Sequence, residues 1–295
     1  MLTSESNKKS FSSIENTEQY VKQMGTENIK PYVIGDDVQF SNNVKEQAFE
    51  GMQVFTLNDQ ESLKQKVILY IHGGAWTNQS LNFHWWFLDK IAQSLNAKII
   101  TPIYPKVPHF NYKDTYPKIL NLYKEILETV ESTEQLTIMR DSAGGNIALG
   151  LAHLLKMNRL PQPKDIILLS ACDDMSFENP HIAEYEEKDP MLAREGMEVI
   201  TKIWAADKNV KDSLISPIYG DFKGLGKITH FIGTHECLYP DAIRLDEKLT
   251  EQGIEIDTFV YPKMNHVFVV MPIPEAENAQ QKIISIISAL KEMES

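Results

Sequence analysis

The chain has 295 residues, 42% of them hydrophobic, so it can bury a substantial core in one or two domains. Its formal net charge of -12 argues against nucleic acid as a partner and against anionic membrane surfaces, because both need basic patches. Cys172 and Cys237 are too few for a disulfide framework, and free thiols in a reducing cytosol are the simplest interpretation.

The N-terminal stretch over residues 1–19 is polar and contains no apolar segment, unlike a signal peptide. No run approaches the ~18–20 apolar residues that a membrane-spanning helix needs. We therefore expect a cytoplasmic protein without a membrane span.

Strand-like and helix-like patterns alternate along the chain. The stretch 31–58 is strand-like, and short buried strands are predicted at 67–71, 98–104, 136–139, 166–170, 228–233 and 255–261. Helical patterns lie between them, and the last one covers 283–290. This order predicts an α/β fold, with a mainly parallel sheet and helices on both faces. Residues 175–207 are helical in places but interrupt the alternation, which indicates an insertion.

The sequence Arg140-Asp141-Ser142-Ala143-Gly144 ends a strand pattern and begins a helical one. A sharp strand-to-helix turn with an exposed serine is a nucleophile elbow, although the pattern Gly-x-Ser-x-Gly has Arg140 in place of its first glycine. An arginine there needs a wider turn or an exit route, and its charge needs solvent or a carboxylate. We expect it to lower activity, so that Arg140→Gly would raise the turnover of a simple ester.

A second glycine-rich turn, His72-Gly73-Gly74-Ala75-Trp76, follows the predicted strand 67–71. Glycines allow backbone N–H groups to approach a substrate closely. The N–H groups of Gly73, Gly74 and Ala143 are predicted to form an oxyanion hole, supported by the dipole of the helix that starts at Ala143. An ordinary glycine turn is the alternative.

A general base is expected beyond the last strand, at the same sheet edge as the elbow, and His266 has this position. The acid should lie between nucleophile and base in the chain order Ser…Asp/Glu…His. Glu236 follows the strand that ends at Gly233 and is our prediction. Asp241 is its rival, but a helix start explains an aspartate there through capping and the helix dipole.

Other sites find little support in the sequence. No metal-binding, phosphate-loop or dinucleotide motif occurs, so neither a metal nor a cofactor is expected. The adjacent acids Asp173 and Asp174 are expected in a solvated loop. Six residues are candidates for an apolar acyl pocket, although core packing is the commoner fate of each: Trp76, Trp85, Trp86, Phe177, Met191 and Trp204.

Together, the HGGAW and DSAGGN motifs, residues 233–241 and the His266 loop resemble the hormone-sensitive-lipase-like branch of α/β-hydrolases, which are mostly bacterial carboxylesterases. The resemblance covers about residue 67 to the C-terminus and implies ester hydrolysis through an acyl-serine without a cofactor. Glutamate stands where aspartate is more frequent in that branch. We expect one α/β-hydrolase domain over 1–295, with cap segments at 1–40 and 175–207.

The predicted function is that of a serine carboxylesterase acting on a small-molecule ester. An amidase, peptidase or lactonase would share the same motifs, and a homodimer is left open. An alternative from another class is a catalytically impaired ligand-binding member, similar to the plant gibberellin receptors, which have lost the catalytic histidine. His266 argues against that alternative, whereas Arg140 argues for it.

Overall fold

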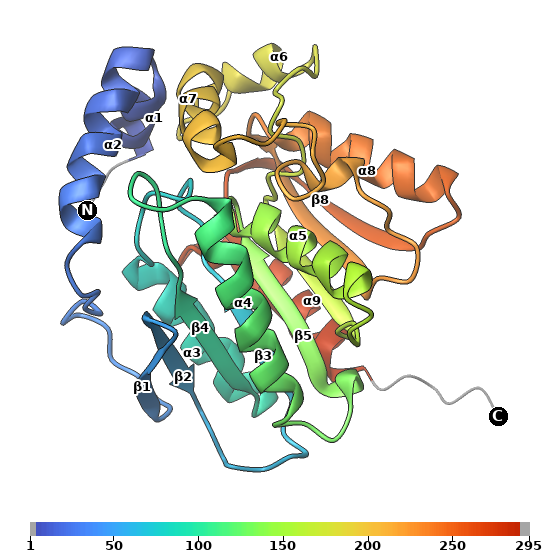
Figure 1. Ribbon diagram of the computed structural model, residues 1–295. Coiled ribbons are helices and arrows are strands. Elements are labelled where there is room, and N and C mark those ends of the chain that lie inside the picture. The colour runs from blue at the N-terminus through green and yellow to red at the C-terminus, as the bar shows by residue number, and fades with distance from the viewer. Residues whose placement is uncertain (1–3, 290–295) are drawn as a thin grey trace.

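The computed structural model describes residues 4–289, which form an eight-stranded sheet with the order β1-β2-β4-β3-β5-β6-β7-β8 (Figure 1). The strands are β1 (Val44–Phe49), β2 (Met52–Leu57), β3 (Val67–Ile71), β4 (Lys98–Ile103), β5 (Leu136–Asp141), β6 (Asp165–Leu169), β7 (Lys227–His235) and β8 (Ile256–Asn265). Neighbouring strands from β4 to β8 are parallel, which confirms the predicted mainly parallel sheet. Every residue of β3, β4, β5 and β6 is buried, as in a sheet covered on both faces.

Of the predicted strand-like stretch 31–58, residues 44–57 fold as a hairpin at the antiparallel edge of the sheet, whereas residues 31–43 form neither helix nor strand. β1 pairs with β2, and β2 pairs with β4, in both cases antiparallel. Glu50 and Gly51 form the turn with φ angles of 46° and 79°. Tight hairpin turns favour two positive φ angles because these match the twist of the strands.

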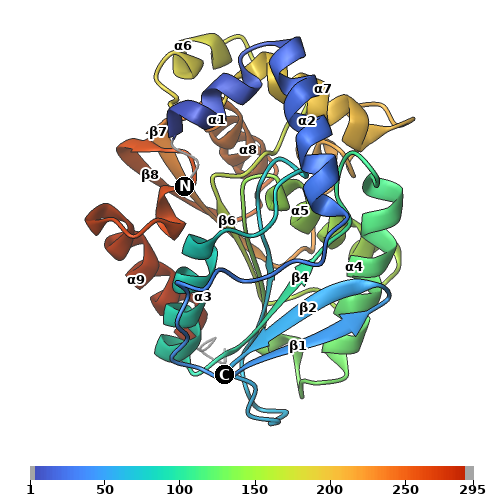
Figure 2. The same ribbon diagram turned by 90° about the vertical axis from the view of Figure 1, so that its left-hand side faces the viewer.

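Helices cover both faces of the sheet (Figure 2). One face carries α3 (Asn82–Leu95) and α9 (Pro274–Ser288), and the other carries α4 (Tyr112–Leu127), α5 (Gly144–Met157) and α8 (Tyr239–Glu251). Residue 290 of the predicted last helix lies outside the described residues. The short 3₁₀ helices are η1 (Thr133–Gln135), η2 (Pro217–Tyr219) and η3 (Phe268–Val270).

A further group of helices lies beyond one end of the sheet: α1 (Ser4–Phe11), α2 (Ile14–Asn28), α6 (Ile182–Glu186) and α7 (Arg194–Ala205) (Figures 1 and 2). These helices come from the two segments predicted as caps, of which residues 1–3 lie outside the described part. The ammonium group of Lys8 donates to the carbonyl oxygens of Glu186 and Asp189, at 2.6 and 2.5 Å. This contact joins α1 to the last residue of α6 and to the chain that follows it.

Cys172 and Cys237 are free and buried. Between residues 4 and 289, no helix has both the length and the apolar character needed to cross a membrane.

Candidate active site

Ser142 lies at the turn between β5 and α5. Its φ of 47° falls in the left-handed region, which is strained for a serine. At Gly144, a Cβ atom would lie 2.1 Å from the carbonyl oxygen of Ile71, so glycine is what allows β3 to approach the turn. The turn therefore has the tight geometry of a nucleophile elbow, although Arg140 precedes it.

Ser142, His266 and Glu236 form a continuous hydrogen-bonded chain at the carboxyl ends of β5, β8 and β7. His266 Nε2 lies 2.7 Å from Ser142 Oγ, and Nδ1 lies 2.8 Å from Glu236 Oε2. Burial alone would lower the pKa of His266, but the hydrogen bond and the charge of Glu236 outweigh it and raise that pKa above 6.5. The carboxylate thus both orients the imidazole and stabilises its protonated form.

The second oxygen of Glu236 is also held in place. Oε1 accepts hydrogen bonds from the Gly233 N–H and from the Ser170 hydroxyl, both at 2.8 Å. Ser170 Oγ in turn accepts from the Val267 N–H at 2.9 Å. Ser170 therefore joins the loop of the acid to the loop of the base. Sequence reasoning missed it, because a single serine after a strand carries no distinguishing pattern.

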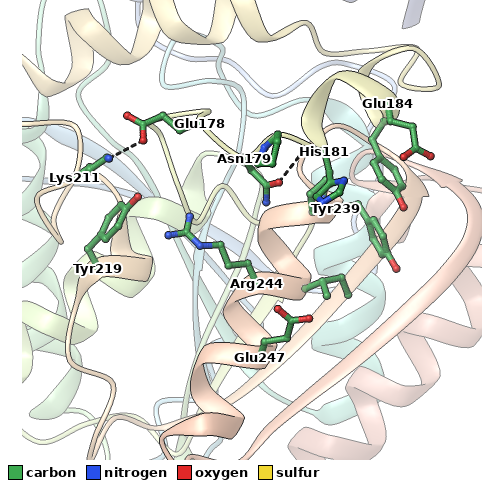
Figure 3. Close-up of a pocket in the computed structure, with 13 residues that line it drawn as sticks. Glu178, Asn179, His181, Glu184, Lys211, Tyr219, Tyr239, Arg244 and Glu247 are labelled. Carbon is green, nitrogen blue, oxygen red and sulfur yellow. Dashed lines mark hydrogen bonds and ion pairs between the residues drawn. The ribbon is translucent and has the colours of Figure 1, made fainter.

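Asp241, the rival acid, lies elsewhere. It occupies the first turn of α8, where its Oδ1 accepts from Asn179 Nδ2 at 2.9 Å. Leu238 is the N-cap, so capping does not explain Asp241, although the helix dipole still favours a negative charge there. Asn179 lines a groove of about 760 Å³ between α6 and α8 (Figure 3). None of Ser142, Glu236 or His266 lines this groove.

The prediction that Gly73 belongs to the oxyanion hole is wrong. Its N–H donates to the buried carboxylate of Asp141, at 2.9 Å from Oδ1, and is therefore not available to a substrate. Gly74 and Ala75, one and two residues further, line the cavity at Ser142. Within residues 4–289, the N–H groups of Gly74, Ala75 and Ala143 donate no hydrogen bond to another backbone group. Ala75 thus lines the cavity with an N–H group that is free of backbone partners, whereas the N–H group of Gly73 is occupied.

Asp141 holds the glycine-rich loop in place through its contact with Gly73 and is itself held by two further side chains. The Tyr70 hydroxyl donates to its Oδ1 at 2.6 Å, and His84 Nε2 lies 3.3 Å from its Oδ2. Because His84 Nδ1 accepts from the Leu81 N–H at 2.9 Å, the ring proton is on Nε2 and faces the carboxylate. Burial would raise the pKa of Asp141, but His84 and the hydrogen bonds from Tyr70 and the Gly73 N–H lower it to about 2. The sequence carried no signal for this cluster, since its members lie on separate elements.

The cavity above Ser142 is small, about 60 Å³. Of the six predicted pocket residues, Met191 alone belongs to its lining. Trp76 and Trp204 stack on each other in the core with ring centroids 5.5 Å apart, and Phe177 is buried in the same cluster. Trp85 is buried on the opposite face of the sheet, and Trp86 is half-buried on the same helix. The apolar lining that sequence reasoning missed consists of Phe11, Leu81, Phe83, Leu192 and Val267.

Asp173 and Asp174 are buried, so the expectation of a solvated loop is wrong. The partners of Asp174 come from distant elements and replace water, whereas the carboxyl oxygens of Asp173 accept no hydrogen bond. Asp174 Oδ2 accepts from Arg244 at 2.6 Å and from the Tyr219 hydroxyl at 2.8 Å. Arg140 lies 3.8 Å from Asp173. Among the residues the structure describes, no group of three or more His, Cys, Asp or Glu side chains is placed to hold a metal ion.

Known proteins share this architecture. A family model described as alpha/beta hydrolase fold matches residues 68–270. An esterase of Acinetobacter venetianus is 27% identical over 228 residues, covering 76% of this chain and 75% of its own. A crystal structure of a Staphylococcus aureus protein has a TM-score of 0.91 at 31% identity, covering 96% of both chains. A structure of an esterase from the bacterial hormone-sensitive lipase family has a TM-score of 0.78 at 22% identity, covering 92% and 90%. The chain therefore belongs to the α/β-hydrolase family.

Proposed function

We propose that this protein is a serine carboxylesterase that hydrolyses small carboxylic esters through an acyl-serine intermediate. The observation that carries the proposal is the chain Ser142–His266–Glu236, with contacts of 2.7 and 2.8 Å. It joins a serine hydroxyl on a strained turn to a base, and the base to an acid. This is what covalent catalysis by serine requires.

In the first half-reaction, His266 Nε2 takes the proton of Ser142 Oγ while Oγ attacks the ester carbonyl carbon. Glu236 stabilises the imidazolium that forms. The carbonyl oxygen becomes an oxyanion, which accepts hydrogen bonds from the N–H groups of Gly74, Ala75 and Ala143 at the start of α5. The tetrahedral species collapses as His266 gives its proton to the leaving alcohol, and Ser142 carries the acyl group.

In the second half-reaction, His266 takes a proton from a water molecule, whose oxygen attacks the acyl carbon. The new tetrahedral species expels Ser142 Oγ, which recovers the proton from His266. The carboxylic acid leaves, and the enzyme returns to its starting state. Every proton in this cycle moves through the same imidazole nitrogen, so no cofactor takes part.

The size of the cavity supports a short acyl group. Its volume of about 60 Å³ is far below the ~300–1,000 Å³ of ordinary ligand pockets. Phe11 of α1 and Met191 and Leu192 from the second cap segment form part of its wall. We therefore propose that the helices α1, α2, α6 and α7 act as a cap that limits acyl length.

Hydrolysis of p-nitrophenyl acetate, butyrate and octanoate tests the proposal, with p-nitroacetanilide as the matching amide. We expect turnover of acetate and butyrate, little of octanoate or the amide, and none by S142A. A fluorophosphonate probe should label the wild type and not S142A. A well-folded wild type that neither hydrolyses the esters nor reacts with the probe would instead support the ligand-binding alternative.

The cap is tested by F11A, which removes a ring from the cavity wall. Because one methylene changes discrimination by ~10–200-fold in a hydrophobic pocket, we expect the butyrate-to-acetate ratio of kcat/KM to rise about tenfold. I14A is the matched control, since Ile14 begins α2 and is 52% exposed. An unchanged ratio in F11A would refute the proposed cap.

A further inference from the structure

Arg140 departs from the elbow pattern, and its side chain is fully buried, at 0% exposure. It extends from β5 toward the first turn of α5, where Gly145 leaves room for it. A Cβ atom at Gly145 would lie 1.5 Å from Arg140 Nη1. The arginine therefore needs neither a wider turn nor an exit to solvent, and it occupies space directly beside the helix that follows the nucleophile.

Asp173 is the acidic partner of this arginine and supplies the opposite charge above its pKa of about 8. Its Oδ1 lies 3.8 Å from Arg140 Nη2, and both side chains are completely enclosed. Burial lowers the pKa of Arg140 to about 10, while the charge of Asp173 acts in the other direction. Since a buried cation without an anion nearby is strongly destabilising, Asp173 is what makes an arginine acceptable at this position.

Asp173 belongs to the segment 170–174, which also contacts the reacting groups. The Cys172 N–H donates to the carbonyl oxygen of Ser142 at 3.3 Å. The hydroxyl of Ser170, at the start of the segment, donates to Glu236 Oε1 at 2.8 Å. The position of this segment therefore sets where the nucleophile and the acid lie relative to each other.

We propose that Arg140 is a positioning residue for ester hydrolysis, which acts through Asp173 to hold segment 170–174 where Ser142 and Glu236 align with the base. This inference rests on the function proposed above. The Arg140 side chain does not line the cavity, and its nitrogens make no hydrogen bond to Ser142, Glu236 or His266. If it only filled space, its loss would lower thermal stability and leave turnover by the folded enzyme unchanged.

The test compares R140M, D173N and the double variant R140M/D173N by kcat, KM and Tm with p-nitrophenyl acetate at pH 9. This pH lies above the pKa of Asp173, which burial raises to about 8, so the carboxylate is charged. Since misplacement of reacting groups by ~1 Å can cost ~100-fold, we expect R140M to lower kcat about tenfold or more at nearly constant KM. The double variant should regain the Tm that D173N loses, because no buried cation is left without its partner, while its kcat stays low.

I138V is the matched control, as Ile138 is buried on the same strand. It should lower Tm and leave kcat unchanged. If R140M does not fold, D173N, which keeps the shape of its side chain, should show the same loss of kcat at constant KM. A wild-type kcat in R140M or D173N, or recovery of kcat together with Tm in the double variant, would overturn this inference alone. A wild type without Ser142-dependent hydrolysis would overturn the proposed function as well.

Discussion

Two of the buried histidines that lie beside carboxylates, His266 and His230, have pKa values that move in opposite directions. His266 Nδ1 is 2.8 Å from Glu236, and its pKa is raised above 6.5. His230 Nδ1 is 3.9 Å from Asp173, and burial, together with the charge of Arg140, lowers its pKa to about 3. Both rings are almost completely buried, so burial does not explain the difference.

The sign and distance of the nearest charge decide the outcome. A hydrogen-bonded carboxylate stabilises the imidazolium of His266, which fits a group that must take a proton during a reaction. His230 has a cation nearby and its carboxylate beyond hydrogen-bond distance, so its ring stays neutral. Its Nε2 accepts a hydrogen bond from the Ala171 N–H at 3.2 Å. Of the two histidines, only His266 has surroundings that suit acid–base chemistry at neutral pH.

Replacing each histidine in turn is the strongest test of this comparison. We expect H266N to lower kcat roughly 10⁴- to 10⁶-fold, as loss of the base does in serine hydrolases. H230Q keeps an acceptor for the Ala171 N–H and should lose less than about tenfold, on the order of one hydrogen bond. The measurement is kcat with p-nitrophenyl acetate. Equal losses in the two variants would contradict the comparison.

Neutralising the acid should change the pH profile as well as the rate. E236Q removes the charge that raises the pKa of His266, so this pKa should fall. Since the base acts in its neutral form, the acidic limb of kcat/KM should move to lower pH, and kcat should drop about 10²- to 10⁴-fold. D241N is the control and should keep the wild-type limb. A limb that does not move in E236Q would refute Glu236 as the partner of the base.

Ser170 tests how tightly the acid must be held. S170A removes one donor to Glu236 and the acceptor of the Val267 N–H, and we expect kcat to fall about tenfold, since a hydrogen bond to a charged group is worth ~1.5–3 kcal/mol. S285A, on the exposed side of α9, removes only a bond to the Gln281 carbonyl and should have no effect. A wild-type kcat in S170A would show that the loops need no such link.

A separate effect is expected on stability rather than on turnover. Burial raises the pKa of Asp173 from 3.8 to about 8, so the folded state holds its proton more tightly than the unfolded state. The free energy of unfolding should therefore fall as pH rises from about 4 to 8, by at most about 1.4 kcal/mol per unit. D173N should remove this contribution, measured by urea unfolding at several pH values. If the free energy of unfolding depended on pH in the same way in the wild type and in D173N, this prediction would be contradicted. The groups around Asp173 that also bear on its charge are Arg140, Cys172, Asp174, His230 and Asp241.

The prediction about Arg140 is reversed by its surroundings. From the sequence, Arg140→Gly was expected to raise turnover, because the usual elbow has glycine there. The structure pairs the arginine with Asp173 and fits it against Gly145. We now expect Arg140→Gly to lower both stability and turnover, because it leaves a buried carboxyl without its cation and opens a cavity.

Alternating strand and helix patterns were enough to predict the fold, because parallel strands need crossovers and these produce a regular spacing in the sequence. The same spacing identified Ser142, Glu236 and His266 as residues that follow strands, and the structure brings them together. Only tertiary packing decided which N–H groups of the glycine-rich loop stay free, which side chains line the cavity, and what neutralises Arg140. Each of these depends on a contact between residues far apart in the chain, such as Asp141 with Gly73, or Phe11 with the cavity at Ser142. The hydrophobic periodicity of a segment predicts which face of a helix or strand is buried. It does not predict which other element that face packs against, so it could not reveal these contacts.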